Sequence, residues 1–314
     1  MKPSPTNSKE YPVDIQLAKP NHLISLATSA VVVHVEVNVW TATRQDKQIS
    51  NEVTTAKRAS ADAGKFTQNL LANSPEHKAV LNYRQTVYNW LQRCTFDWAG
   101  PLRLLPTIRM EKFMSELDQH KMAFNRLLDD FIDKYPQLVS DAAFKQGDMF
   151  DRSAYPEPQD VRNKFRIKEF ISTVPENDFR NTVSTALAED LAHHYQRQTE
   201  QIVNSVMDDA AERLISIAER ISSACTEVEP EHDGKVRRKK IYENTISNAR
   251  EICEVLGAFN LTNNTTLEDA RQRLEDALRD VTLEDLRESS YTRAKVKDSV
   301  DDMLSKFKPL RSFA

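Results

Sequence analysis

The sequence predicts a mainly α-helical protein with a small β element (α+β): a small antiparallel sheet with inserted helices, followed by a long coiled-coil-like helical arm. Residues 31–40 alternate valine with other residues at the period of a strand. Longer segments repeat apolar residues every three or four positions, the spacing of a packed helix. From about residue 180 to 226 this spacing is close to a heptad, which is typical of long paired helices.

These patterns divide the chain into three parts. Residues 1–20 contain four prolines and no period, so we expect a flexible arm. Residues 21–180 contain both strand segments and several helices, and we expect them to form an α+β core unit. Residues 181–314 are expected to form the helical, coiled-coil-like region.

The sheet is expected to form from two strands that lie about 130 residues apart in the sequence. In VVVHVEVNVW (31–40), the valines at 33, 35, 37 and 39 share one face, which indicates a strand with one buried side. In KFRIKEFISTV (164–174), Arg166, Lys168 and Phe170 alternate with three other side chains. We therefore expect these three residues to share a face.

Helices are expected between the two strands. Residues 44–73 are rich in Ala, Lys, Gln and Thr, with apolar residues at helical spacing. Residues 74–76 (Ser-Pro-Glu) are a typical helix start, with a cap, a proline in the first position and an acid in the first turn. Residues 95–108 contain two prolines and are expected to be a break, and residues 110–135 should form a helix that ends before Pro136.

The C-terminal part is expected to be helical almost throughout. A turn at residues 229–234 separates the heptad-like helix from a second helix that stops near Gly257. Two shorter helices open with the same residues, Thr-Leu-Glu-Asp, at 266–269 and 282–285. In each, the threonine is expected to cap the helix and the acids to favour its first turn.

The composition argues against several kinds of site. Five of 314 residues are glycine and no two are close together, so a glycine-rich loop that cradles phosphates is excluded. Cys94, Cys225 and Cys253 are far apart and form no CxxC pair, which favours buried, reduced thiols. The longest apolar run is far too short to span a bilayer, and no secretory signal precedes it. We expect a cytoplasmic protein.

No arrangement of residues typical of catalysis is present. Glu189, Asp190, His193 and His194 lie close together in the heptad-like helix, but a di-iron bundle needs a Glu-x-x-His pair on each of two helices. A solvated helix face is therefore favoured over a metal site there. We expect a binding protein that needs no cofactor, and not an enzyme.

Basic and aromatic residues mix in two regions, and single-stranded nucleic acid is held by stacking on aromatic rings beside positive charge. The alternative is structural, because rings at strand and helix periods are usually buried and charged runs are usually solvated. The candidate residues of the core unit are Trp40, Arg44, Arg103, Arg109, Lys112, Arg166, Lys168 and Phe170. A separate candidate is the densest charge cluster of the chain, which we call the basic run and which could hold phosphates or could be a solvated first helical turn paired with nearby glutamates. Its candidate residues are Lys235, Arg237, Arg238, Lys239 and Lys240.

Four short motifs, in order along the core unit, carry a family resemblance. They are VNVW at 37–40, RLLP at 103–106, FIDKYP at 131–136 and PQDVRNKF at 158–165. Their layout, a little under half of the chain, resembles a phage and bacterial protein family of uncharacterised function. The resemblance implies a context in tailed phages and plasmids, near MoxR-type AAA+ ATPases and von Willebrand A-type proteins. It implies no catalytic residues.

Two functions follow as expectations. The first is a phage-type protein that binds single-stranded DNA in replication or recombination, through the second strand and residues 103–112, and self-associates through its long helices. The second is an adaptor or assembly protein, a partner of an AAA+ ATPase or a virion component, that docks through the helical arm. One open basic surface formed by Trp40, Arg44, Arg166, Lys168 and Phe170 would favour the first.

Overall fold

The computed structural model describes residues 26–174, 185–228 and 237–307. Side chains are described for all of these except residues 185–193, 195–196, 227–228 and 237–238. The described part is mainly α-helical with a small antiparallel sheet, so the predicted fold class is confirmed.

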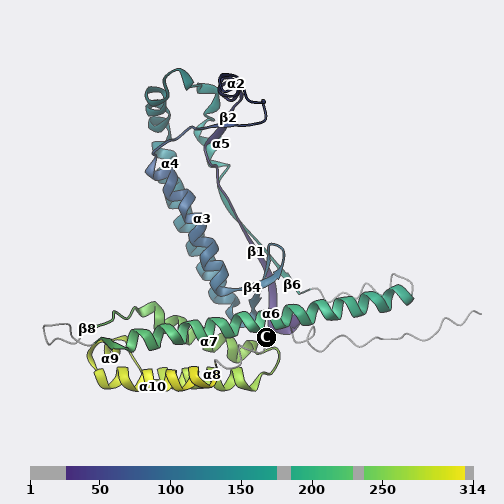
Figure 1. The fold of residues 1–314 in the computed structure, drawn as a ribbon, viewed down its shortest axis with the longest axis vertical. Helices are drawn as coiled ribbons and strands as arrows, with labels where there is room; N and C mark the ends of the chain where they lie inside the picture. The colour runs from purple at the N-terminus through teal and green to yellow at the C-terminus, as the bar shows by residue number, and fades with distance from the viewer. Residues whose placement is uncertain (1–25, 175–184, 229–236, 308–314) are drawn as a thin grey trace, which may run out of the picture.

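The described residues form three regions, which we call the platform, the stalk and the tip (Figure 1). The platform consists of α6 (Thr185–Cys225), α7 (Glu243–Phe259), α8 (Thr265–Leu278), α9 (Leu283–Glu288), α10 (Ser290–Phe307) and the short strands β7 (Glu227–Val228) and β8 (Arg237–Arg238). The stalk stands on the platform and contains β1 (Ala30–Asn38), α3 (Pro75–Cys94), β4 (Phe96–Ala99), β5 (Leu102–Pro106), η1 (Thr107–Arg109), α4 (Met110–Gln146) and β6 (Arg166–Thr173).

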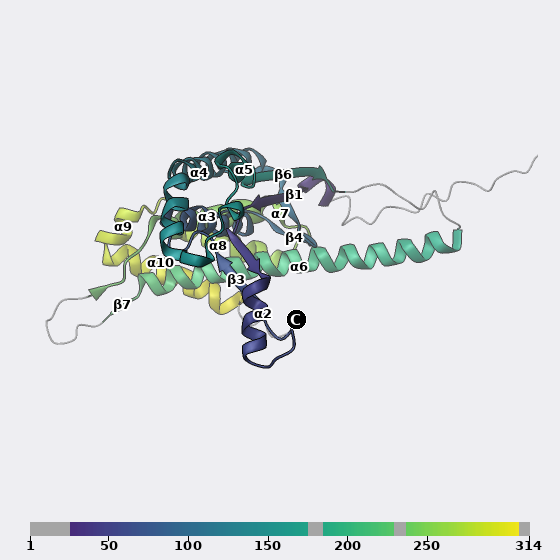
Figure 2. The ribbon, with the colours of Figure 1, turned by 90° about the horizontal axis from the view of Figure 1, so that it is seen from above.

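The tip lies at the far end of the stalk (Figure 1). It contains β2 (Thr43–Asp46), α2 (Lys47–Ala56), β3 (Phe66–Asn69), the last turns of α4, η2 (Gly147–Met149), η3 (Arg152–Ala154) and α5 (Pro158–Arg162). Seen from above, the stalk elements gather over α7 and α8, while α6 extends well past them (Figure 2).

The central sheet is antiparallel and has the strand order β4-β5-β1-β6. The predicted pairing is confirmed: β1 pairs with β6 from Val31 opposite Thr173 to Asn38 opposite Arg166. The expected break at 95–108 is wrong, because β4 and β5 form there and extend the sheet. Leu104 and Leu105 are fully buried on its two faces, which favours a strand even though Pro106 ends the segment.

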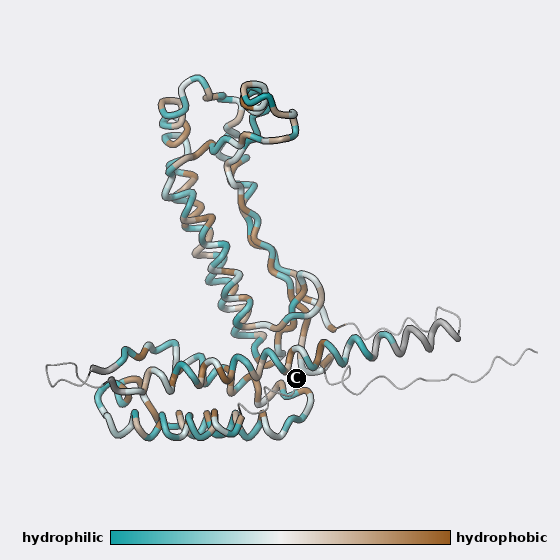
Figure 3. Tube along the Cα trace, in the orientation of Figure 1, coloured by the Kyte–Doolittle hydropathy of each residue, from teal (hydrophilic) through white to brown (hydrophobic). Residues whose placement is uncertain are grey.

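Strand β1 contributes to two hydrophobic cores. Val33, Val35 and Val37 pack with α3 and α4 in the stalk core, where they are at most 3% exposed. Ala30 and Val32 point the other way and join the platform core, together with Phe96 and Leu104. Brown and teal residues accordingly interleave along the stalk and platform helices, as expected for elements that bury one side (Figure 3).

Two helix boundaries differ from the prediction. Within residues 44–73 the helix is limited to Lys47–Ala56. Strand β2 before this helix pairs with strand β3 after it. Helix α4 continues through Pro136 to Gln146. A proline in a helix loses one hydrogen bond, and burial of Tyr135 and Ala142 on either side of it favours continuation.

The platform follows the predicted helix order. Helix α6 is confirmed, and its heptad-like residues Val206, Ala210 and Ile221 are buried in the platform core. Thr282 caps α9 as predicted and forms a capping box with Asp285, whereas α8 is capped by Asn264 and not by Thr266. Helix α7 passes Gly257 and ends at Phe259, and the predicted turn at 229–234 lies outside the described residues.

Arg213 of α6 joins the stalk to the platform. Its guanidinium donates to the carbonyls of Arg93 and Thr95 at the end of α3, both at 2.9 Å. It also pairs with Asp209 at 2.7 Å and lies 4.7 Å from the centroid of the Phe96 ring. The last carbonyls of α3 thus find a cationic donor on another element, a common way of satisfying a helix end.

Two phenylalanines of α4 provide a matched test of the stalk core. Phe131 is fully buried, so Phe131→Ala should lower the free energy of unfolding by about 3–5 kcal/mol. Phe144, on the same helix, is 90% exposed, so Phe144→Ala should change it by less than about 0.5 kcal/mol. Urea unfolding followed by circular dichroism measures both, and equal effects of the two changes would contradict the described packing.

Candidate nucleic-acid interface

The β1–β6 ribbon presents one open face. Strand β5 pairs with β1 only over Ala30–Val33, so beyond that point β1 and β6 continue as a two-stranded ribbon. One side of this ribbon packs on α3 and α4 through the stalk core. The other side, which we call the ribbon face, carries His34, Glu36 and Asn38 from β1 and Arg166, Lys168 and Phe170 from β6.

The cross-strand register fixes the neighbours on the ribbon face. Phe170 lies opposite His34, Lys168 opposite Glu36, and Arg166 opposite Asn38. The Phe170 side chain is 54% exposed, an unusual state for a large apolar ring in the middle of a strand. The predicted alternation of Arg166, Lys168 and Phe170 thus brings these three side chains onto one face.

The ribbon face has a small excess of positive charge. Arg166 and Lys168 are exposed, and Glu36 is the one carboxylate among the six residues of the face. Glu36 accepts a hydrogen bond from Nδ2 of Asn38 at 2.9 Å. Glu169 points to the opposite side of the strand and pairs with Lys121 of α4 at 2.7 Å. A phosphate on this face would therefore meet two cations and one acid.

His34 was not among the residues that the sequence singled out. Its Nδ1 donates to the carbonyl of Pro101 at 3.0 Å, which fixes the ring beside Phe170. His34 could have been identified only from the register of β1 on β6. The alternation of residues within either strand alone does not predict that register.

Trp40 and Arg44 lie elsewhere, towards the tip. The Trp40 ring is partly buried in the stalk core, 6.2 Å from the centroids of both His77 and Tyr135. Its carbonyl accepts a hydrogen bond from Nε2 of His77 at 2.8 Å. Arg44 pairs with Asp151 at 2.5 Å. Neither residue extends the ribbon face.

Arg103, Arg109 and Lys112 lie at the base of the stalk and are held by acids. Arg103 pairs with Asp97 and donates to Thr95. Arg109 and Lys112 both pair with Glu251 of α7, and they line a cleft of about 1070 Å³ between the stalk and the platform. These cations join elements of the chain to one another, which is a structural role.

The described residues of the basic run lie at one end of the platform (Figure 1). Lys235 is outside the described residues, and Arg237 and Arg238 form β8 with side chains that are not described. Lys239 donates to the hydroxyl of Ser223 at 3.0 Å, and the Lys240 amine lies 5.2 Å from the Tyr242 ring centroid. The run is thus separate from the ribbon face (Figure 1).

Nucleophilic and metal chemistry finds little support in the described residues. Within them no group of three His, Cys, Asp or Glu side chains is placed to hold a metal ion. The side chains of Glu189, Asp190 and His193 are not described. Burial raises the pKa of the Cys94 and Cys253 thiols to about 12 and also raises that of Cys225. None of the described helices has the length and apolar character that crossing a membrane requires.

Comparison with known proteins gives no further guide to the site. No protein-family model matches the chain, and neither the curated proteins nor the solved structures contain a significant match. The resemblance to the phage and bacterial family therefore stays a prediction.

The ion-paired base of the stalk can be tested by removing its shared acid. Glu251→Gln should lower the free energy of unfolding by about 1–3 kcal/mol, because Arg109 is only 9% exposed and would lose its carboxylate. Glu254→Gln on the exposed side of α7 is the matched control. Urea unfolding measures both variants, and an unchanged midpoint for Glu251→Gln would contradict a structural role for the pair.

The cysteines give a second test. Because the thiolate is the reactive form, the three buried thiols should resist a thiol-specific reagent at about pH 8. All three should react after unfolding in urea. One thiol that reacts in the native protein as fast as free cysteine would show an accessible, activated side chain and reopen the question of nucleophilic chemistry.

Proposed function

We propose that this is a non-catalytic binding protein that holds single-stranded DNA on the ribbon face. The observation that carries the proposal is the placement of Phe170, 54% exposed, on the same open face as Arg166 and Lys168. Stacking on an aromatic ring together with cations for the phosphates is the usual way in which proteins hold single strands.

The arrangement favours a single strand over a duplex. Stacking on Phe170 requires a base whose flat side is free, and in a duplex the bases are stacked on one another. His34, directly opposite Phe170, offers a second ring for a neighbouring base. With two cations on the face, the electrostatic part of the affinity is modest, and stacking should contribute a large share.

Variants of the ribbon face test the proposal. Phe170→Ala should weaken binding of a labelled single strand of about 20 nucleotides roughly tenfold or more, since one stacked base contributes about 1–3 kcal/mol. Arg166→Gln with Lys168→Gln should reduce the slope of log affinity against log salt by about 1.4, from two lost phosphate contacts. Fluorescence anisotropy over a series from about 50 to 200 mM salt measures both.

The controls are matched in chemistry and lie on the tip. Phe144→Ala removes an exposed phenyl ring, and Lys57→Gln with Lys65→Gln removes two exposed cations. Both should leave binding unchanged. The proposal fails if the wild-type protein binds no single strand at low salt, if it prefers duplex, or if the control variants lose as much affinity as the ribbon variants.

A second candidate function is that of an adaptor or assembly protein, with an AAA+ ATPase or a virion component as partner. It is favoured by the ion pairs that hold Arg44, Arg103, Arg109 and Lys112 within the chain. It is also favoured by the extended stalk, which carries the tip far from the platform (Figure 1). Absence of nucleic-acid binding in the assay above would leave this function as the stronger one.

A further inference from the structure

The cleft at the base of the stalk is lined by many charged side chains. It has a volume of about 1070 Å³ and lies between α3, η1 and α4 of the stalk and α6 and α7 of the platform. This volume is at the upper end of the range for small-molecule sites. Five cations and four carboxylates line the cleft: Arg93, Arg109, Lys112, Arg213 and Arg220, with Glu116, Asp209, Glu212 and Glu251.

Three of the five cations are held by carboxylates of the same cleft. Arg109 and Lys112 share Glu251, and Arg213 pairs with Asp209 at 2.7 Å. The other two carboxylates of the cleft also have partners within the chain. These contacts fix the walls of the cleft, and they leave two cations over.

Arg93 and Arg220 are those two cations. Both are exposed, and neither forms an ion pair within the described residues. No acid lies three or four positions from either arginine on its own helix, where an intrahelical pair would form. A cation in the last turn of a helix often binds its final carbonyls, but Arg213 already donates to those of α3, so Arg93 is not needed there.

Neutral donors surround the two arginines. Gln92 of α3 and Asn244 and Asn248 of α7 line the same cleft, and their side chains form no hydrogen bond within the described residues. Each amide offers two N–H donors and each guanidinium offers five. Such donors match the oxygens of phosphate and carboxylate groups, and a guanidinium binds either group with two parallel hydrogen bonds.

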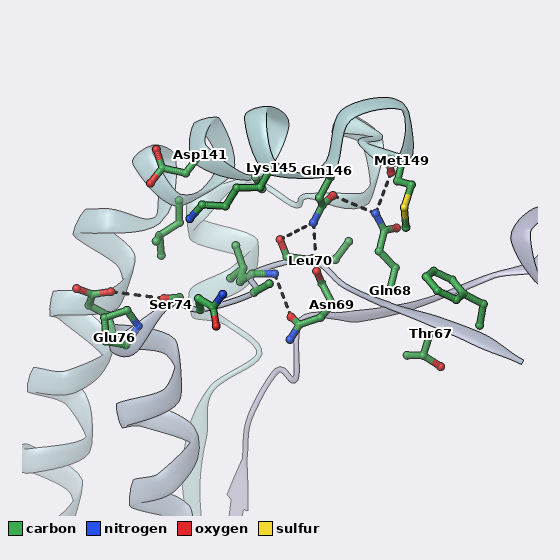
Figure 4. Close-up of a pocket in the computed structure, with 17 residues that line it drawn as sticks. Thr67, Gln68, Asn69, Leu70, Ser74, Glu76, Asp141, Lys145, Gln146 and Met149 are labelled. Atoms are coloured by element: carbon green, nitrogen blue, oxygen red, sulfur yellow. Dashed lines mark hydrogen bonds between the residues drawn. The ribbon is translucent and has the colours of Figure 1, made fainter.

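A pocket in the tip offers a comparison (Figure 4). It has a volume of about 400 Å³ and is lined by one cation, Lys145, and by two acids, Glu76 and Asp141. Its amides hold one another and the backbone: Gln68 donates to Oε1 of Gln146 at 3.0 Å, and Gln146 donates to two carbonyls of the same wall. The tip pocket therefore lacks the spare positive charge and the spare donors of the cleft.

We propose that the cleft binds a small organic polyanion, a molecule with at least two phosphate or carboxylate groups, through Arg93 on the stalk and Arg220 on the platform. A small ligand is favoured over a nucleic-acid strand, because four carboxylates also line the cleft and a continuous row of phosphates would have to pass them. The site shares no residue with the ribbon face, so it stands or falls independently of nucleic-acid binding there.

Isothermal titration calorimetry on the full chain tests the proposal, with tripolyphosphate and citrate as probes at one fixed ionic strength. At least one probe should bind with a Kd of about 1 mM or tighter, and the stronger probe identifies the anionic group that the cleft prefers. Arg93→Gln with Arg220→Gln should weaken that binding at least about tenfold, because two guanidinium contacts are lost. Binding of neither probe, or unchanged binding by the double variant, overturns the proposal.

The control variant removes the same amount of charge elsewhere. Arg84→Gln with Arg126→Gln changes two exposed arginines of α3 and α4 that do not line the cleft. The probes should bind this variant as they bind the wild-type protein. An equal loss in both double variants would show a response to net charge alone and would also overturn the proposal. Circular dichroism confirms that each variant is folded.

Two further measurements locate the ligand. Phenylglyoxal modifies accessible guanidinium groups, so a saturating probe should protect Arg93 and Arg220, but not Arg84 and Arg126, as read by peptide mass spectrometry. The Arg93→Gln, Arg220→Gln variant should also bind the labelled single strand as tightly as the wild-type protein does. Protection of all four arginines alike, or a loss of strand binding as large as the loss of probe binding, would overturn a small-ligand site in the cleft.

Discussion

The pairing of β1 with β6 is the interaction on which the rest of the structure depends. It joins residues that lie more than 120 positions apart and closes the insert that forms the helices of the stalk and the tip. Closing a loop of that length costs about 4 kcal/mol of chain entropy. Burial of one valine contributes about 1.5–3 kcal/mol, so Val33, Val35 and Val37, all nearly fully buried, are enough to offset the closure.

Local patterns in the sequence were sufficient to predict the fold class, both strands of the ribbon and most helices. They failed where long-range packing outweighed the local signal. Leu104 and Leu105 lie in a proline-bounded segment that is typical of a loop, yet each is buried on a different side of the sheet. Pro136 predicts the end of a helix, yet α4 stays helical because residues on either side of Pro136 are buried in the core. A proline inside a helix costs about 3 kcal/mol, and the burial of Tyr135 and Ala142 by the continued helix offsets a cost of that order.

The candidate interface was predictable only in part. Alternation along β6 placed Arg166, Lys168 and Phe170 on one face, but the register that brings His34 opposite Phe170 depends on the partner strand. The other cations show why composition alone does not locate a binding surface. Arg44 and Arg109 find their acids 107 and 142 positions away in the sequence. A basic residue next to an aromatic residue indicates a binding surface only if the fold leaves its charge unpaired.

Because α4 is long, a small rotation at the base of the stalk produces a large displacement of the tip. Its 37 residues span about 55 Å at the rise of an α-helix. A rotation of about ten degrees at the base would therefore move the tip by about 10 Å. The contacts of Arg213 with the end of α3, and of Arg109 with Glu251, are among those that fix this angle, together with the stalk residues that enter the platform core. The packing at the foot of the stalk thus determines where its far end lies.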